Sequence, residues 1–349
     1  MFDDLIGNER AKVVLRRMLR QGRVPGALLF AGDEGLGKKL FALELARAFN
    51  CLARVGIEAC GVCSACARIG KFQYPTKEGK DARDAYKKVI WSEHKDVGQV
   101  IAFSRVILVD AIRNLEYESN FRPTEGTARV FLVEEADKLN DESSNALLKT
   151  LEEPPLTTHI VLITSQPASL LPTIRSRCQT VRFAPLAASE LEEFMVGKRL
   201  RVGDEVKLAA QLAGGRPGLA VGFNLDAYLT RRDWALGVVE ALTGLDADRA
   251  RLLRAAEELS DAKNKEEFEP RLDVLETLIR DLWLATLRAE GIRPVNSDIS
   301  ERLARLGEGL PPRRPAGWLS RVEELREQLA VNINRRVASD ALFLSMAED

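Results

Sequence analysis

The sequence has no apolar run long enough to cross a lipid bilayer, which takes about 20 predominantly apolar residues. It also lacks an excess of charge of either sign, since 51 lysines and arginines stand against 52 aspartates and glutamates. The first four residues, 1–4, include two aspartates and do not have the pattern of a signal peptide. We therefore expect a cytoplasmic protein that does not bind nucleic acid tightly through its overall charge.

The distribution of apolar residues predicts the fold class. The chain has 349 residues, which predicts two or three domains, and no internal repeat stands out. Short apolar runs at 27–31, 130–133 and 160–163 are separated by helical patterns, and 180–183 is expected as an edge strand. Fully apolar strands that alternate with helices predict a parallel sheet with helices on both faces. Residues 106–109 are also apolar, but their pattern fits either a strand or the start of a helix.

The strand signals stop after residue 185, which divides the chain into three predicted parts. Residues 1–185 form the α/β part, 186–222 a small helical module, and 226–349 a helical region with apolar residues at spacings of three and four. Residues 75–96 are polar and rich in lysine, and we expect them to form a solvated surface loop.

A glycine-rich turn follows the first predicted strand and comes before a predicted helix, where a phosphate loop belongs. Its residues Gly32, Gly35 and Gly37 allow backbone N–H groups to point at phosphate oxygens, and Lys38 would contact the outer phosphates. The strand before the turn and the helix after it support this interpretation. A glycine turn that serves only the path of the chain is the alternative.

Two departures from the usual pattern predict weak ATP binding. The position that normally carries a serine or threonine for magnesium is Lys39, which has no hydroxyl. The apolar strand 130–133 delivers Glu134 and Glu135, whereas the first of these carboxylates is usually an aspartate. Both changes act against holding a metal ion. We expect ATP with magnesium to bind weakly at best, and hydrolysis to be negligible.

Four cysteines within sixteen residues predict a metal site. Cys51, Cys60, Cys63 and Cys66 have the spacing C-x8-C-x2-C-x2-C, and a C-x2-C step allows two thiolates to bind one tetrahedral ion. Four thiolates leave no open coordination position, so the Zn²⁺ would be structural. Four unrelated cysteines, or an iron–sulfur cluster, are the alternatives. Cys178 is far away in the sequence and is expected to fill apolar space.

The order of these segments resembles one family. It runs from a strand and phosphate loop through the four-cysteine insert 51–66 and the acidic strand to Ser176-Arg177-Cys178. In this order residues 1–222 resemble the clamp-loader branch of the AAA+ ATPases. Residues 2–8 resemble the segment that lines the adenine pocket, residues 145–155 are typical of the family, and residues 332–344 resemble the last helix of its collar.

The resemblance implies a fold and a set of partners. It implies a RecA-like AAA+ module over 1–185, a helical lid over 186–222 and an all-α collar domain over 226–349. It further implies a five-subunit ring with motor subunits and delta, which opens the sliding clamp and places it on primer–template DNA. Within the ring of the bacterial DNA polymerase III clamp loader, the resemblance implies a rigid stator.

The resemblance also assigns roles to single residues. Arg177 would be an arginine finger supplied in trans to the nucleotide site of the adjacent motor subunit, where it stabilises charge on the transferred phosphoryl group. Thr164 or Ser165 would sense phosphate, and Arg216 would be the arginine of the lid. An exposed loop arginine without such a role is the alternative for Arg177.

Two other functions remain open, and so does a possible DNA contact. The chain is either the stator or an ATP-hydrolysing motor subunit of the same loader, or it is an unrelated AAA+ ATPase.

Direct contact with DNA would use a basic helical stripe, although such a stripe is more often only a solvated face. The stripe comprises Lys12, Arg16, Arg17 and Arg20.

Overall fold

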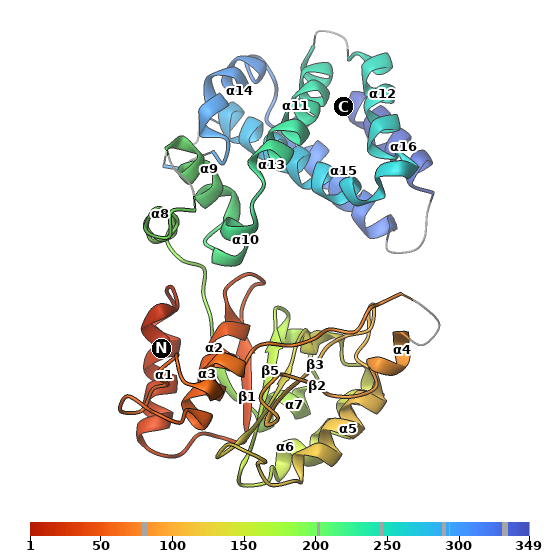
Figure 1. The fold of residues 1–349 in the computed structure, drawn as a ribbon. Coiled ribbons are helices and arrows are strands. Elements are labelled where there is room, and N and C mark those ends of the chain that lie inside the picture. The colour runs from red at the N-terminus through yellow and green to blue at the C-terminus, as the bar shows by residue number, and fades with distance from the viewer. Residues whose placement is uncertain are drawn as a thin grey trace. The chain divides into compact units, whose positions relative to one another are not determined.

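The structure, a computed structural model, describes residues 1–78, 82–200, 203–244, 247–287, 291–292, 294–329 and 334–348 (Figure 1). The chain divides into two compact units, which are described separately. The first comprises Met1–Leu200 and Ala213–Gly222, and the second Arg201–Leu212 and Phe223–Asp349. The division into three domains at 1–185, 186–222 and 226–349 stays a prediction.

The first unit is built on a six-stranded sheet with the order β2-β3-β4-β5-β1-β6. The strands are β1 (Ala27–Ala31), β2 (Ile90–Trp91), β3 (Val97–Val100), β4 (Arg129–Val133), β5 (Thr158–Thr164) and β6 (Gln179–Arg182). Strands β3, β4, β5, β1 and β6 are parallel to their neighbours, and β2 runs antiparallel to β3. The predicted parallel sheet and the edge position of β6 are confirmed.

Helices cover both faces of this sheet (Figure 1). They are α1 (Glu9–Arg20), α2 (Lys38–Asn50), α3 (Ser64–Arg68), α4 (Ala82–Ala85), α5 (Val109–Ser119), α6 (Asp141–Glu152) and α7 (Pro172–Arg177), with 3-10 turns at Phe2–Asp4, Ala136–Lys138 and Pro167–Ser169. Successive side chains of β1 point to opposite faces of the sheet. Leu28 and Phe30 pack with α1 and α2, whereas Leu29 packs with α5, α6 and α7. Both faces of the central strands are therefore buried, which explains their continuous apolar sequences.

The expectation of a solvated loop over 75–96 is wrong in part. Ile90–Trp91 pair with the sheet as β2, and His94 and Asp96 are buried. The Asp96 carboxylate accepts hydrogen bonds from the backbone N–H groups of residues 124–126 at 2.6–2.9 Å, which satisfies its buried charge. Of the ambiguous run 106–109, only Val109 is helical, as the first residue of α5. Residues 79–81 lie outside the described part of the chain.

Two further helices of the first unit are α8 (Ala188–Gly197) and α10 (Pro217–Gly222). Helix α10 begins directly against the phosphate loop, where the Gly218 N–H donates a hydrogen bond of 2.8 Å to the carbonyl oxygen of Gly35. A Cβ atom at Gly218 would lie 3.1 Å from Gly35 Cα, so a larger residue there would press on the loop. The start of α10 thus fixes the outer wall of the loop.

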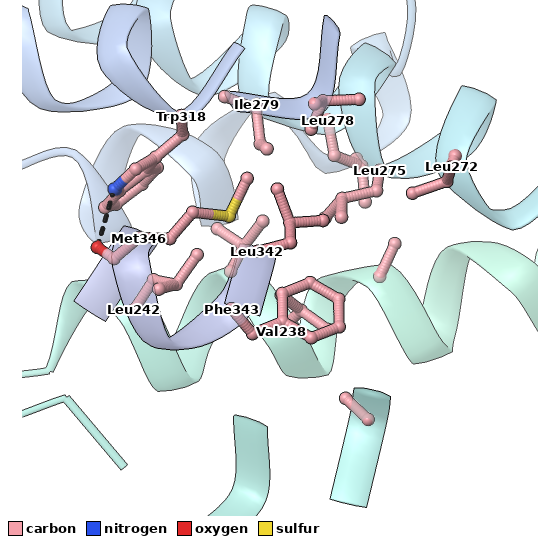
Figure 2. Close-up of a cluster of buried hydrophobic side chains, with 14 of the residues drawn as sticks. Val238, Leu242, Leu272, Leu275, Leu278, Ile279, Trp318, Leu342, Phe343 and Met346 are labelled. Atoms are coloured by element: carbon pink, nitrogen blue, oxygen red, sulfur yellow. Dashed lines mark hydrogen bonds between the residues drawn. The ribbon is translucent and has the colours of Figure 1, made fainter. Parts of the chain in front are cut away.

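The regular elements described in the second unit are all helices. It contains α9 (Asp204–Ala213), α11 (Leu225–Thr243), α12 (Arg249–Leu259), α13 (Phe268–Leu287), α14 (Ser300–Leu306), α15 (Arg313–Leu329) and α16 (Arg335–Glu348), with 3-10 turns at Ala262–Glu267 and Ser297–Ile299. Its core includes Trp318, whose indole N–H donates to the carbonyl oxygen of Met346 at 3.0 Å (Figure 2). This bond satisfies the polar atom of a fully buried ring. The last predicted helix appears as α16, while residues 332 and 333 lie outside the described part.

Candidate functional site

A cavity of about 380 Å³ lies where β4 and β5 end and α2 begins. Its lining comprises Glu34, Gly35, Gly37, Lys38, Lys39, Glu134, Glu135, Asp137, Ile163, Thr164, Ser165 and Gly218. The structure therefore brings together every predicted nucleotide residue except Gly32, which lies outside the lining. The carboxyl ends of parallel strands meet at one edge of a sheet, which is why these distant segments converge.

The loop keeps the backbone shape that the glycines predict. Gly35 has a φ of +82° and Gly37 a φ of +81°, a left-handed conformation that most other residues adopt only with strain. Gly37 precedes the first residue of α2, and Gly37, Lys38 and Lys39 line the cavity, so the N-terminal end of the helix lies at the cavity. The scaffold of a phosphate loop is thus present in this chain.

Lys38 turns back onto its own loop. Its side chain is buried, and its ammonium donates hydrogen bonds to the carbonyl oxygens of Gly32 and of Asp33, the latter at 2.6 Å. Burial lowers the pKa of Lys38, while the carboxylates of Asp33, Glu34 and Asp137 act in the opposite direction. The loop backbone therefore satisfies the cation that would otherwise contact a phosphate.

Lys39 forms an ion pair with the first carboxylate of the acidic motif. Its Nζ lies 2.6 Å from Glu134 Oε1 and donates a hydrogen bond of 2.8 Å to the hydroxyl of Tyr74. The rings of Phe72 and Tyr74 lie 5.5 and 5.3 Å from the same nitrogen, within the range of a cation–π contact. Burial alone would lower the pKa of Lys39, but the contacts with Glu134 and Tyr74 outweigh it and raise the pKa. A protonated lysine therefore stands between the loop and the acidic strand.

Two further polar side chains of the cavity, Glu135 and Thr164, have partners within the chain. Glu135 has a φ of +50° and pairs with Lys138 at 2.6 Å. The hydroxyl of Thr164 donates to the Asp137 carboxylate and accepts the N–H of Gln166 at 2.9 Å. Of the two hydroxyls predicted to sense phosphate, that of Thr164 is thus bonded to a carboxylate that the sequence interpretation did not assign.

Residues 2–8 do not line the cavity in the described structure. Phe2 is fully buried, and its ring centroid lies 6.2 Å from that of Phe41 on α2. The guanidinium of Arg16 lies 6.0 Å from the centre of the Phe2 ring. The segment that resembles an adenine-binding region therefore contributes its aromatic ring to the hydrophobic core beneath α1 and α2.

Arg177 is the last residue of helix α7 and not part of a loop. About a third of its side chain (34%) is exposed. Its Nε lies 2.7 Å from Glu152 Oε1, and its Nη1 donates to the Thr173 carbonyl oxygen at 3.0 Å. It does not line the cavity of its own chain. Arg216, expected as the lid arginine, donates to the Ala213 carbonyl oxygen at 2.9 Å and does not reach the cavity either.

The four clustered cysteines converge on one point. Their Sγ atoms all lie within 4.8 Å of one another, and Cys51 Sγ lies 3.5 Å from Cys60 Sγ and 3.8 Å from Cys63 Sγ. Four sulfurs around a tetrahedral ion with Zn–S bonds of about 2.3 Å would be about 3.8 Å apart. The N–H groups of Cys60 and Cys63 point at the preceding thiols at 3.2 and 3.3 Å. The donor set and its spacing therefore fit one zinc ion.

Cys178 behaves differently from the cluster. It is buried among the apolar residues beneath α5, α6 and α7, and burial raises the pKa of its thiol to about 12. A thiol of this kind is unreactive at neutral pH and fills space. The structure supports the expectation that it serves packing.

The predicted basic stripe on α1 is wrong for two of its four members. Lys12 is buried and pairs with Glu9 at 2.7 Å. Arg16 pairs with Asp3 at 2.7 Å and also contacts Glu58. Glu58 is far from α1 in sequence, so helical periodicity alone could not reveal its contact with Arg16. Arg17 and Arg20 are exposed as expected.

No helix among the described residues has both the length and the apolar character to span a membrane.

Comparisons with known proteins match this chain to subunits of DNA polymerase III. A model of the family described as "DNA polymerase III, delta subunit" matches residues 7–187. DNA polymerase III subunit delta' of Escherichia coli (strain K12) is 30% identical over 93% of this chain and 89% of its own length. The delta' subunit of Bacillus subtilis (strain 168) is 33% identical over 54% of this chain and 50% of its own length. DNA polymerase III subunit tau of Salmonella typhimurium is 27% identical over 89% of this chain, which spans 48% of that relative. The chain belongs to the family of DNA polymerase III delta-prime subunits.

Proposed function

We propose that this chain is the stator subunit of a DNA polymerase III clamp loader, and that it hydrolyses little or no ATP itself. In this role it lends Arg177 to the nucleotide site of an adjacent motor subunit. The observation that carries the proposal is the ion pair of 2.6 Å between Lys39 and Glu134 inside the cavity. It stands where an active site of this kind would hold magnesium.

The ion pair opposes metal binding in two ways. Magnesium in such sites is coordinated by the oxygen atoms of a hydroxyl and a carboxylate. The Lys39 ammonium has three hydrogen-bond donors and no acceptor, so it cannot coordinate the ion. The Glu134 carboxylate, which would otherwise attract the ion, is already neutralised by the ammonium. Lys38 and Thr164 are also held by groups of the chain, so a triphosphate would have to displace several contacts.

The position of Arg177 suits a role outside its own chain. The guanidinium is partly exposed at the end of a helix and does not line its own cavity. Its pair with Glu152 is partly exposed at both ends, and such pairs contribute only about 0.2–1 kcal/mol. The arginine can therefore leave Glu152 for a stronger anionic partner at small cost. A phosphoryl group in transfer is such a partner.

The test is ATP turnover by a reconstituted loader. We expect Arg177→Ala to leave assembly intact and to slow hydrolysis at one motor site by a factor within about 10³–10⁵, the range known for arginine fingers. Arg175→Ala, on the same short helix and also exposed, is the matched control. Glu152→Gln removes the resting partner of Arg177 and should not reduce turnover. Equal turnover for the wild-type and Arg177→Ala complexes would exclude the proposed role.

Zinc and the wider assembly complete the proposal. The four cysteines would hold a structural Zn²⁺, which supplies folding free energy to the insert. The implied partners are the motor subunits and delta in a five-subunit ring, and the sliding clamp and primer–template DNA reached through that ring. Sedimentation of the mixed subunits tests the composition of the ring directly.

An ATP-hydrolysing motor subunit is the second candidate. The similarity to a tau subunit over 89% of this chain favours it, as does the preserved loop backbone. Lys39 and Glu134 argue against it, because a motor needs the metal. Magnesium-dependent ATP hydrolysis by the isolated chain would favour this second candidate over the stator.

A further inference from the structure

We infer that the outer face of α1 is a binding surface for the phosphate backbone of duplex DNA. Four arginines form this surface, which we call the arginine face: Arg10, Arg17, Arg20 and Arg23. The inference goes beyond the proposed function, which assigns no DNA contact to any residue of this chain. It does not depend on Arg177 or on the nucleotide cavity.

The arginine face is cationic because the acids of this region are used elsewhere. Glu9 pairs with the buried Lys12, and Asp3 and Glu58 are both taken by Arg16. Within the described residues, no carboxylate pairs with any of the four arginines, and all four are exposed. The carboxylates of Glu9, Asp3 and Glu58 are thus paired with Lys12 and Arg16, so the four arginines leave a net positive charge on the exposed side of α1.

The helix dipole does not account for the arrangement. Arg17 and Arg20 lie in the last turn, where a cation is favourable, but Arg10 lies in the first turn, where a cation is unfavourable. Single exposed arginines are ordinary surface features. Four of them without a carboxylate partner in the described structure, gathered on one helix and its end, give this surface a local positive charge in a chain whose net charge is −1.

The arginines are carried on a rigid support. Residues Ala11 and Leu15 on the opposite side of α1 are buried in the core beneath it. Helix α1 ends at Arg20 and is followed by Gly22 with a φ of +61°, and the Arg23 N–H donates to the Met18 carbonyl oxygen at 3.2 Å. This pattern is a Schellman end, which fixes Arg23 beside the last turn. The spacing of the four cations is therefore set by the helix itself.

The spacing matches one strand of a duplex. Arg10 and Arg20 are ten residues apart, about 15 Å along a helix axis. One strand of B-form DNA presents a phosphate about every 3.4 Å of axis, so about four phosphates fall within that length. Arginine binds phosphate in a bidentate manner, which favours it over lysine for such contacts.

Two other occupants fit less well. Helix α1 has no aromatic residue on which the bases of a single strand could stack, which favours a duplex. Its exposed apolar residues are Val13 and Val14 alone, too few for the broad apolar face that inserts into a lipid surface. An acidic protein surface is the remaining alternative, and the experiment below separates it from DNA.

The experiment measures binding of the full chain to a fluorescent DNA duplex by anisotropy over a salt series of about 50–200 mM. Four phosphate contacts at about 0.9 each predict a slope of about −3.6 in log K against log salt, and thus a ~150-fold loss of affinity across the series. Changing the four arginines of the face together to glutamine should remove most of this slope. Arg10→Gln and Arg17→Gln alone should each reduce it by about 0.9.

The control is a second fourfold variant with the same change in net charge. It replaces Arg249, Arg254, Arg280 and Arg305, all exposed residues of the second unit, by glutamine. This variant should keep the wild-type slope, and circular dichroism should show both variants folded. The inference is wrong if the wild-type chain does not bind the duplex at about 50 mM salt, if the two fourfold variants lose affinity equally, or if polyglutamate displaces the DNA at equal charge concentration.

Discussion

Replacing Lys39 by methionine tests the ion pair inside the cavity. The change removes the ammonium but keeps an apolar chain of similar length, so Glu134 remains as a carboxylate without its cation. Breaking a fully buried pair on one side costs about 3–5 kcal/mol, whereas an exposed pair contributes about 0.2–1 kcal/mol. The side chains of Lys39 and Glu134 are 33% and 24% exposed, between these limits. We therefore expect Lys39→Met to destabilise the first unit by about 1–3 kcal/mol.

A double-mutant cycle separates the pair from other effects of the substitution. Glu134→Gln removes the carboxylate charge, and the double variant Lys39→Met/Glu134→Gln removes both charges. We expect a coupling of about 1–2 kcal/mol, with the double variant more stable than the sum of the single changes implies. Scanning calorimetry follows the unfolding midpoint, which for a unit of this size shifts by about 2–4 °C per kcal/mol.

The pH dependence of this contribution has a definite sign. The folded-state pKa of Lys39 is raised above its ordinary value of 10.5, because the contacts with Glu134 and Tyr74 outweigh the effect of burial. The stabilisation is therefore complete below pH 10.5 and is lost as the pH rises through the folded-state pKa.

The matched control for the stability experiment is Lys77→Met at an exposed position, which should not change the unfolding midpoint. A coupling of zero, or equal midpoints for Lys39→Met and wild type, would show that the pair contributes nothing.

Two further predictions concern the cysteine cluster and Glu125 in the loop before β4. Cys63→Ser should lose zinc, measured by atomic absorption, and have a lower unfolding midpoint. Cys178→Ala is the control and should keep its zinc. Unchanged metal content in Cys63→Ser would contradict the proposed zinc site. The Arg68 guanidinium, which contacts Glu125 at 2.7 Å, lowers the pKa of that carboxyl to about 2. The contribution of the Arg68–Glu125 pair to stability is present above pH 4.5 and is lost as the pH falls toward about 2. The Arg68→Ala variant should therefore unfold at higher pH than the wild type in an acid titration. Coincident unfolding curves would show that the pair does not stabilise the fold.

The sequence predicted those strands whose residues are apolar on both faces. β1, β4 and β5 are buried throughout, so their composition alone distinguishes them. β3 was not predicted, because it contains Gln99, whose buried side chain accepts a hydrogen bond from Tyr74. β2 is only two residues long and follows a lysine-rich segment. A short strand with a polar member gives no periodic signal.

The sequence predicted the residues of the cavity better than their contacts. Lys39 and Glu134 were each identified as departures from a magnesium site, but their direct pairing depends on the order of β1, β5 and β4 in the sheet. Tyr74 was not assigned at all, since nothing in the spacing of the cysteine insert places it beside Lys39. Lys12 was misjudged for a related reason, because its burial on α1 is set by tertiary packing.

The most direct test of the account is equilibrium binding of fluorescent ATP with magnesium to the full chain. The central claim is that the Lys39–Glu134 pair occupies the place of the metal. The account predicts no saturable binding in the micromolar to millimolar range over which working enzymes bind their substrates, and no increase when magnesium is added. Saturable, magnesium-dependent binding at micromolar ATP, followed by turnover in the isolated chain, would contradict it.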